Sequence, residues 1–124
     1  MDGKRRISLV IPVYNESANL PALFVALRDA AATVDGDVEF LFVDDGSGDD
    51  SLARLEAFAA EEPRAKVVGL ARNFGKEIAV TAGIRHATGD ACLTMDADLQ
   101  HPPAMIGAFV DAWRGGAEVV VGVR

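Results

Sequence analysis

The sequence predicts an α/β fold in which a mostly parallel sheet is flanked by helices. Short apolar runs, several of them rich in Val and Ile, alternate with longer stretches whose apolar residues recur at helical spacing. Strands buried on both faces of a parallel sheet read as continuous apolar runs, and amphipathic helices supply the connections that parallel strands require. Because the alternation occurs five times, we expect a largely parallel sheet with right-handed crossovers.

The predicted strands are the short apolar runs, in chain order Ile7–Val13, Val38–Val43, Ala65–Leu70, Ala91–Met95 and Glu118–Val121. None approaches the roughly 18 apolar residues that a membrane span needs. The first run follows a basic start, as in a signal peptide, but it is short and polar residues follow it without a small-residue cleavage site. We therefore interpret it as a buried strand.

Four stretches between the strands show the apolar spacing of helices. The periodic residues are Leu20, Leu23, Phe24 and Leu27 in the first stretch and Leu52, Leu55, Phe58 and Ala59 in the second. Ile78, Ala82 and Arg85 lie within the third stretch, and Met105, Phe109 and Trp113 within the fourth. Residues that favour helix ends flank these stretches, with Ser17 and Ser51 as N-caps, Pro102-Pro103 in a first turn, and Gly36, Gly89 and Gly115-Gly116 as stops.

Composition limits the classes of protein that this chain can be. With 124 residues, 50% of them hydrophobic, it is long enough for one domain with its own core. The 12 Lys and Arg against 19 Asp and Glu give a net charge of -7, which argues against a nucleic-acid partner. Cys92 is the only cysteine, which excludes a disulfide framework, and its apolar strand predicts a core position. Together with the missing signal peptide, this favours a cytosolic setting.

Polar residues cluster directly after each of the first four predicted strands. Strand by strand they are Tyr14-Asn15-Glu16, Asp44-Asp45-Gly46-Ser47, Arg72-Asn73-Phe74-Gly75-Lys76 and Asp96-Ala97-Asp98-Leu99-Gln100. In open parallel sheets, ligands bind beyond the carboxyl ends of the strands. We therefore expect these groups to meet at one edge of the sheet.

The segment Asp96-Ala97-Asp98 is the sharpest local signal for chemistry. Two carboxylates two residues apart point to one side of an extended backbone, and they repel each other unless a cation lies between them. Mg²⁺ and Mn²⁺ prefer oxygen ligands and often share them with substrate phosphates, and Gln100 offers another oxygen at the same spacing. The alternative is a plain acidic loop, because Asp-x-Asp is a common sequence.

The other polar groups each allow two interpretations. Asp44-Asp45-Gly46-Ser47 is either an ordinary turn or an acceptor for a base or a ribose. Glu16 is either a carboxylate that favours a helix start or a site residue. Arg72 and Lys76 are either solvated charges or the cations that meet the phosphates of a ligand.

With these motifs in hand, the chain resembles the family 2 glycosyltransferases of the GT-A type, and within them the dolichyl- and polyprenyl-phosphate sugar transferases. The resemblance covers nearly the whole chain, from Ile7 to Arg124, and rests on several motifs in the expected order. They are Val10–Glu16, Phe42–Ser47, Arg72–Glu77, Thr81–Gly83, Ala87–Asp90, Met95–Pro103 and Val120–Arg124.

The resemblance implies a role for each candidate site residue. Pro12, Tyr14 and Glu16 would line the nucleotide pocket, Val43 and Asp45 would hold the base and ribose with Asp44 close by, Asp96 and Ala97 would lie against the ribose and diphosphate, and Asp98 and Gln100 would ligate Mg²⁺ or Mn²⁺. The metal would neutralise the departing nucleoside diphosphate, which makes Asp98 the expected catalytic residue.

The resemblance also implies an activity, the inverting transfer of a sugar from a UDP- or GDP-sugar to a polyprenyl or dolichyl phosphate. The lipid phosphate is anionic at neutral pH and would attack the sugar C1 with little need for a protein base. Such a transferase would work at the cytoplasmic face of the membrane, in the biogenesis of the cell envelope.

The family would continue beyond Arg124 into an acceptor half with further basic residues and membrane-contacting segments. Residues 1–124 are therefore expected to be the nucleotide-sugar-binding part of a truncated GT-A domain, which meets the lipid phosphate through the missing part. On its own this part should be slow or inactive. The unpaired edge of such a sheet could also lead to association with a second copy.

Three alternatives stay open on the sequence. A response-regulator receiver domain has a similar length and an acidic pocket, but its acidic pair normally ends the first strand, where this chain has Tyr14-Asn15-Glu16. A regulatory module that binds a sugar nucleotide without turnover would keep the same donor pocket. A family 2 transferase that acts on a polysaccharide would share the first two motifs.

Overall fold

All four strands in the described part of the chain lie parallel in one sheet, in the order β3-β2-β1-β4. The computed structural model describes residues 6–34 and 37–98. The strands are β1 (Ile7–Val13), β2 (Val38–Asp44), β3 (Ala65–Gly69) and β4 (Ala91–Thr94). This arrangement confirms the predicted parallel α/β sheet to within one residue at each strand end. The fifth predicted strand, Glu118–Val121, lies outside the described residues.

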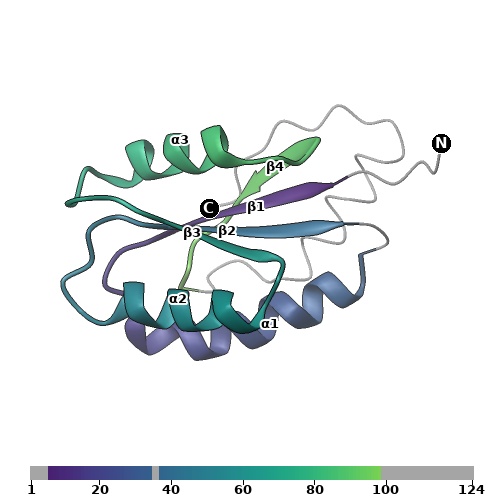
Figure 1. Ribbon diagram of the computed structural model, residues 1–124, viewed down its shortest axis with the longest axis horizontal. Coiled ribbons are helices and arrows are strands. Elements are labelled where there is room, and N and C mark those ends of the chain that lie inside the picture. The colour runs from purple at the N-terminus through teal and green to yellow at the C-terminus, as the bar shows by residue number, and fades with distance from the viewer. Residues whose placement is uncertain (1–5, 35–36, 99–124) are drawn as a thin grey trace.

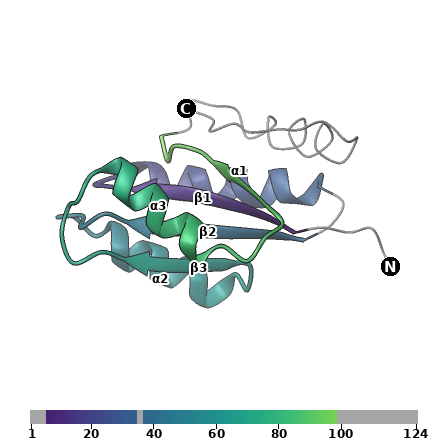
Figure 2. The same ribbon diagram turned by 90° about the horizontal axis from the view of Figure 1, so that it is seen from above.

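Helices cover both faces of the sheet (Figure 1). A single 3₁₀ turn, η1 (Ser17–Asn19), leads into α1 (Leu20–Ala32), and α2 (Ser51–Glu61) and α3 (Lys76–His86) follow. Of the described helices, α1 and α2 lie on one face and α3 lies on the other, with α2 packed along β3 and α3 against β1 and β2 (Figures 1 and 2). None of these described helices combines the length and apolarity of a membrane span. The helix predicted around Met105–Trp113 lies outside the described residues.

The larger core lies between the sheet and the pair α1 and α2. Alternate residues of β1, among them Leu9 and Ile11, point into it and are essentially unexposed. The rings of Phe24 and Phe58 stack with their centroids 4.1 Å apart, and both meet Phe42 of β2 edge-on. Burial of aromatic side chains on this scale dominates core energetics, so this cluster ties both helices to the centre of the sheet.

The N-cap predictions for Ser17 and Ser51 are wrong. Ser17 begins the 3₁₀ turn, α1 follows Asn19, and Ser51 is already the first residue of α2 after Asp50, with no side-chain cap on either helix. Both hydroxyls are instead used between loops. Ser17 Oγ donates to Asp50, and Ser51 Oγ accepts the Glu16 N–H at 3.0 Å. Each hydroxyl therefore makes a tertiary hydrogen bond in place of the helix-capping bond that the local pattern predicted.

Two further expectations need correction at β4. The third helix ends at His86, not at Gly89, and Gly89 instead passes so close to β1 that an added Cβ would lie 2.5 Å from Ser8 Oγ. Cys92 is only partly buried, because β4 lies at one end of the described sheet. Burial on both faces therefore holds for β1 and β2 and not for the outer strands. The other predicted helix ends, Gly36, Pro102-Pro103 and Gly115-Gly116, fall outside the described residues.

Candidate functional site

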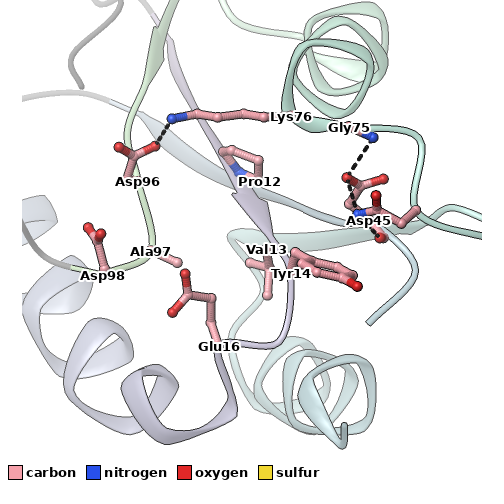
Figure 3. A pocket seen from close by; sticks show the side chains of 11 residues that line it. Pro12, Val13, Tyr14, Glu16, Asp45, Gly75, Lys76, Asp96, Ala97 and Asp98 are labelled. Atoms are coloured by element: carbon pink, nitrogen blue, oxygen red, sulfur yellow. Dashed lines mark hydrogen bonds and ion pairs between the residues drawn. The ribbon is translucent and has the colours of Figure 1, made fainter. Parts of the chain in front are cut away.

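A pocket of about 440 Å³ opens at the carboxyl ends of the strands, where the polar segments were predicted to meet. Its walls come from the segments after all four described strands (Figure 3). The lining residues are Pro12, Val13, Tyr14, Glu16, Asp45, Asn73, Gly75, Lys76, Asp96, Ala97 and Asp98. The structure thus brings together eight of the predicted substrate-binding and catalytic residues, which are Pro12, Tyr14, Glu16, Asp45, Lys76, Asp96, Ala97 and Asp98.

The end of β1 supplies an aromatic ring and a carboxylate. Tyr14 is 48% exposed, which leaves its ring at the pocket surface. Glu16 Oε1 accepts a hydrogen bond from Asn19 Nδ2 at 2.6 Å, and its backbone N–H is held by Ser51. Figure 3 shows both side chains at the wall of the pocket that β1 forms. This wall could accept a flat base beside a hydrogen-bond acceptor.

The carboxylate of Asp45 is buried and holds the loop after β3. Oδ1 accepts the Phe74 N–H at 2.8 Å, and Oδ2 accepts the Gly75 N–H and Asn73 Nδ2, both at 3.0 Å. Asp45 is 3% exposed. It therefore lines the pocket and also fixes the neighbouring wall through these hydrogen bonds. No local sequence pattern predicts such hydrogen bonds between distant segments.

Val43 and Asp44 lie outside the pocket lining. Val43 is fully buried in a small cluster with Leu41 and Ala79, beneath α3. The Asp44 carboxylate, also buried, accepts hydrogen bonds from the Ser47 N–H at 3.1 Å and from Ser47 Oγ at 2.6 Å. Both residues are buried and neither lines the pocket, so the lining gives no support to their predicted contact with a base or ribose.

Only one of the two predicted cations lines the pocket. Arg72 lies outside the lining and places its guanidinium 4.7 Å from the centre of the Phe74 ring. Lys76, at the first position of α3, reaches across the pocket, and its Nζ lies 2.5 Å from Asp96 Oδ1 (Figure 3). Among the lining residues that the structure describes, Lys76 is the only Lys or Arg. It is thus the described cation best placed to meet a phosphate there.

The segment after β4 closes the opposite wall. Asp96 is half-buried and paired with Lys76, Ala97 is buried, and Asp98 is exposed at the pocket. Gln100, the other predicted metal ligand, lies outside the described residues. Glu16 and Asp98 give the same pocket hard oxygen donors, the chemistry that Mg²⁺ and Mn²⁺ prefer. No group of three candidate ligating side chains is found within residues 6–34 and 37–98. The carboxylates of Glu16 and Asp98 are thus of the ligand type that a divalent cation takes.

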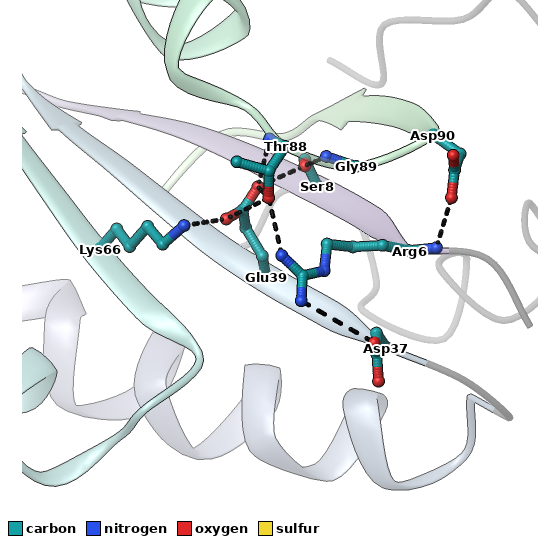
Figure 4. A network of polar contacts seen from close by, with 8 residues as sticks. All are labelled: Arg6, Ser8, Asp37, Glu39, Lys66, Thr88, Gly89 and Asp90. Carbon is teal, nitrogen blue, oxygen red and sulfur yellow. Dashed lines mark hydrogen bonds and ion pairs between the residues drawn. The ribbon is translucent and has the colours of Figure 1, made fainter.

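A second polar cluster, at the opposite ends of the strands, was missed by the sequence reasoning. The buried Glu39 carboxylate accepts hydrogen bonds from Ser8 Oγ at 2.6 Å and the Thr88 N–H at 2.9 Å, and pairs with Lys66 Nζ at 2.8 Å (Figure 4). Ser8 Oγ in turn accepts the Gly89 N–H at 2.9 Å. The available signal was a polar residue at the second position of each of two apolar strands, Ser8 in β1 and Glu39 in β2. This cluster joins β1, β2, β3 and the segment that precedes β4.

Unfolding should become easier in acid because of Glu39. Burial raises the pKa of this carboxyl, but hydrogen bonds from Lys66, Ser8 and the Thr88 N–H outweigh it and lower the pKa from 4.5 to about 2. The ionised carboxylate thus stabilises the fold above pH 4.5, and the contribution is lost as the pH falls toward 2. We expect Glu39→Gln to remove on the order of 2 kcal/mol at pH 7 and much less at pH 2.5. Urea unfolding at pH 7 and at pH 2.5 measures the free energy of unfolding, with the variant Glu56→Gln at an exposed position as the control. An equal loss at both pH values would contradict this.

The chain matches the family model described as Glycosyl transferase family 2 over residues 8–124. The undecaprenyl-phosphate 4-deoxy-4-formamido-L-arabinose transferase of Klebsiella pneumoniae is 46% identical over 97% of this chain. A prophage bactoprenol glucosyl transferase homologue of Escherichia coli is 39% identical over 96% of this chain. The chain spans 37% and 39% of the length of these two relatives.

Solved structures share the fold. The glucosyl-3-phosphoglycerate synthase of Mycobacterium tuberculosis, in complex with Mn²⁺, UDP and glucosyl-3-phosphoglycerate, aligns with a TM-score of 0.69 at 28% identity and covers 90% of this chain and 40% of its own. A mannosyltransferase of Pyrobaculum calidifontis, in complex with GDP-Man and Mn²⁺, aligns with a TM-score of 0.67 at 24% identity over 85% of this chain and 31% of its own. These likenesses confirm the predicted GT-A architecture.

Proposed function

The chain belongs to glycosyl transferase family 2, and from that premise we propose that the protein transfers a sugar from a nucleoside-diphosphate sugar to a polyprenyl phosphate. The observation that carries the proposal is the identity of 39–46% with transferases named for bactoprenol and undecaprenyl phosphate, over nearly the whole chain. Residues 1–124 form the nucleotide-sugar-binding part of this activity.

The donor lies in the pocket at the carboxyl ends of the strands. Tyr14 and Pro12 contact the base, with Glu16 as an acceptor beside them, and Asp45 fixes the wall against which the base and ribose rest. Asp96 and Ala97 lie against the ribose and the diphosphate. Support comes from the lining itself, since all of these residues face one cavity of about 440 Å³, a volume in the range of small-ligand sites.

Asp98 and Gln100 would hold Mg²⁺ or Mn²⁺ beside the diphosphate. The bound metal supplies Lewis-acid stabilisation of the negative charge that develops on the leaving nucleoside diphosphate. The protein's own task is to orient the donor. Lys76 is released from Asp96 when phosphate enters the pocket, because a diphosphate offers the ammonium a more highly charged partner than one carboxylate does.

The acceptor is the anionic phosphate of the lipid, which needs no deprotonation before it attacks C1. Attack from the face opposite the leaving group inverts that carbon. Placing the acceptor oxygen within reach of C1 supplies much of the rate, as in other reactions between two bound substrates. The membrane-bound lipid would locate the reaction at the cytoplasmic face of the membrane.

Transfer of label to the lipid phase tests the proposal. The 124-residue chain, and the longest protein that its gene encodes, are each incubated with radiolabelled UDP-glucose, GDP-mannose and related donors, undecaprenyl phosphate and Mg²⁺, and the lipid is extracted. We expect lipid labelling by the longest protein and little by the 124-residue chain. Efficient labelling by the chain alone would show that it needs no further acceptor region.

Two other outcomes would overturn part of the proposal. Label that enters a polysaccharide and never the lipid contradicts the acceptor and leaves the donor site standing. Nucleotide binding without transfer to any acceptor indicates a regulatory sugar-nucleotide-binding module.

A further inference from the structure

We propose that Asn15 is a positioning residue for donor binding, which rests on the proposed function of the pocket. Its side chain does not line the pocket, but the residues on either side of it, Tyr14 and Glu16, both do. The proposal is that the backbone turn made by Asn15, and the hydrogen bonds that hold this turn, set the direction in which those two side chains point.

The backbone of Asn15 adopts a left-handed conformation with a φ of 54°. Among the described residues it is the one non-glycine residue with a positive φ. Asn and Asp enter this region more easily than other residues with a Cβ, because their short polar side chains can hydrogen-bond locally. The turn comes two residues after the end of β1 at Val13 and redirects the chain toward η1.

Two hydrogen bonds lock the turn to the loop after β2. The Asn15 N–H donates to Ser47 Oγ at 2.9 Å, and Asn15 Oδ1 accepts the Gly48 N–H at 2.7 Å. Ser47 Oγ donates onward to Asp44 Oδ1 at 2.6 Å, and Asp44 is 2% exposed. The turn is thus anchored through one hydroxyl to a buried carboxylate of the sheet. This assigns a role to Asp44, which supports the pocket without lining it.

The residue after the turn is fixed in the same way. The Glu16 N–H donates to the hydroxyl of Ser51, which is fully buried at the start of α2. Backbone groups on both sides of the Asn15 peptide therefore bind hydroxyls that belong to the neighbouring loop and helix. The geometry makes Tyr14 and Glu16 one unit, whose orientation depends on a conformation that most side chains disfavour.

Three substitutions separate the two contributions of Asn15. Asn15→Asp keeps an acceptor oxygen and a residue that tolerates the left-handed region, so it should behave like the native protein. Asn15→Gly keeps the backbone conformation and loses the bond to the Gly48 N–H. Asn15→Ala loses both, and we expect it to weaken nucleotide binding by about tenfold, with Asn15→Gly in between.

Binding is measured by calorimetry with UDP and GDP as probes, with Mg²⁺ present. A second readout follows the pocket directly, because Tyr14 is the only tyrosine of the chain. Fluorotyrosine incorporated there gives a single ¹⁹F signal, and we expect Asn15→Ala to shift or broaden it while Asn15→Asp leaves it in place. Thr33→Ala is the matched control, since its hydroxyl bonds to Ala30 O at the far end of α1. It should lower stability modestly without altering nucleotide binding or the signal.

The outcomes distinguish this inference from the proposed function. Native affinity and a native ¹⁹F signal in Asn15→Ala would overturn the positioning role and leave the function intact. Failure of Asn15→Asp to restore both readouts would also overturn it. If the native protein binds neither nucleotide at millimolar concentration, the donor site is contradicted, while the ¹⁹F series still tests whether Asn15 orients Tyr14.

Discussion

Replacing Asp98 with alanine should lower sugar transfer by the longest protein of this gene by roughly 100- to 1,000-fold. Asp98 lies at the surface of the pocket, and in the proposed function its carboxylate helps to hold the metal ion that compensates the charge of the diphosphate. In calorimetry on the 124-residue chain, the affinity of Asp98→Ala for UDP or GDP with Mn²⁺ should fall to the value measured in EDTA. The lipid-extraction assay measures the loss of transfer.

Two variants serve as comparisons for Asp98→Ala. Asp29→Ala removes an exposed carboxylate from the last turn of α1, outside the pocket lining, and should leave binding and transfer unchanged. Asp45→Ala releases the loop of Asn73 and Gly75, so it should weaken nucleotide binding equally with Mn²⁺ and in EDTA. If Asp98→Ala and Asp45→Ala lose the same affinity in EDTA, the separate roles assigned to them are wrong.

Replacing Gly46 with alanine should lower the free energy of unfolding by about 3 kcal/mol. Gly46 has a φ of 69°, and an added Cβ would lie 2.3 Å from the backbone carbon of Arg72 and 2.4 Å from the backbone nitrogen of Asn73. Because the clash is with backbone, the loop after β3 must move, which also breaks its hydrogen bonds to Asp45. Urea unfolding measures the destabilisation.

Gly48→Ala is the control two residues away. Its Cβ would meet only Asn15 Oδ1, at the ordinary contact distance of 3.8 Å, so we expect little change in stability. Gly46→Ala should also weaken nucleotide binding, because Gly75 and Lys76 belong to the displaced wall of the pocket. A variant Gly46→Ala as stable as Gly48→Ala would show that the loop tolerates displacement.

The sheet and the meeting point of the site residues could be predicted from the sequence. Apolar runs such as Ile7–Val13 are long enough for strands and too short for most helices, and parallel strands place their carboxyl ends at one edge. Hence Glu16, Asp45 and Asp98, far apart in the chain, could be assigned to one pocket before any coordinates were known. That assignment needs only that the strands run parallel, so that their carboxyl ends share one edge of the sheet.

The partners of individual polar groups could not be predicted in this way. Lys76 forms an ion pair with Asp96, and Asp45 accepts a hydrogen bond from the Phe74 N–H. Both contacts join segments far apart in the sequence, where no helical or strand periodicity relates the two residues. Ser51 matched a helix-capping pattern, but its hydroxyl is taken by Glu16. The sequence identifies which side chains can donate or accept hydrogen bonds. Which of them pair depends on the distances between their atoms in the folded chain.

The central position of β1 in the sheet affects how the nascent chain folds during synthesis. Of the four described strands, β1 is synthesised first. Ile7 pairs both with Val38 of β2 and with Ala91 of β4. One edge of β1 therefore stays unpaired until residues 91–94 have been synthesised. At about 5–20 residues per second, that wait lasts several seconds. During it, an apolar strand with unpaired backbone groups is open to pairing with other chains. We therefore expect a chaperone that shields the segment Ile7–Val13 until β4 emerges to raise the yield of folded protein more than any later assistance.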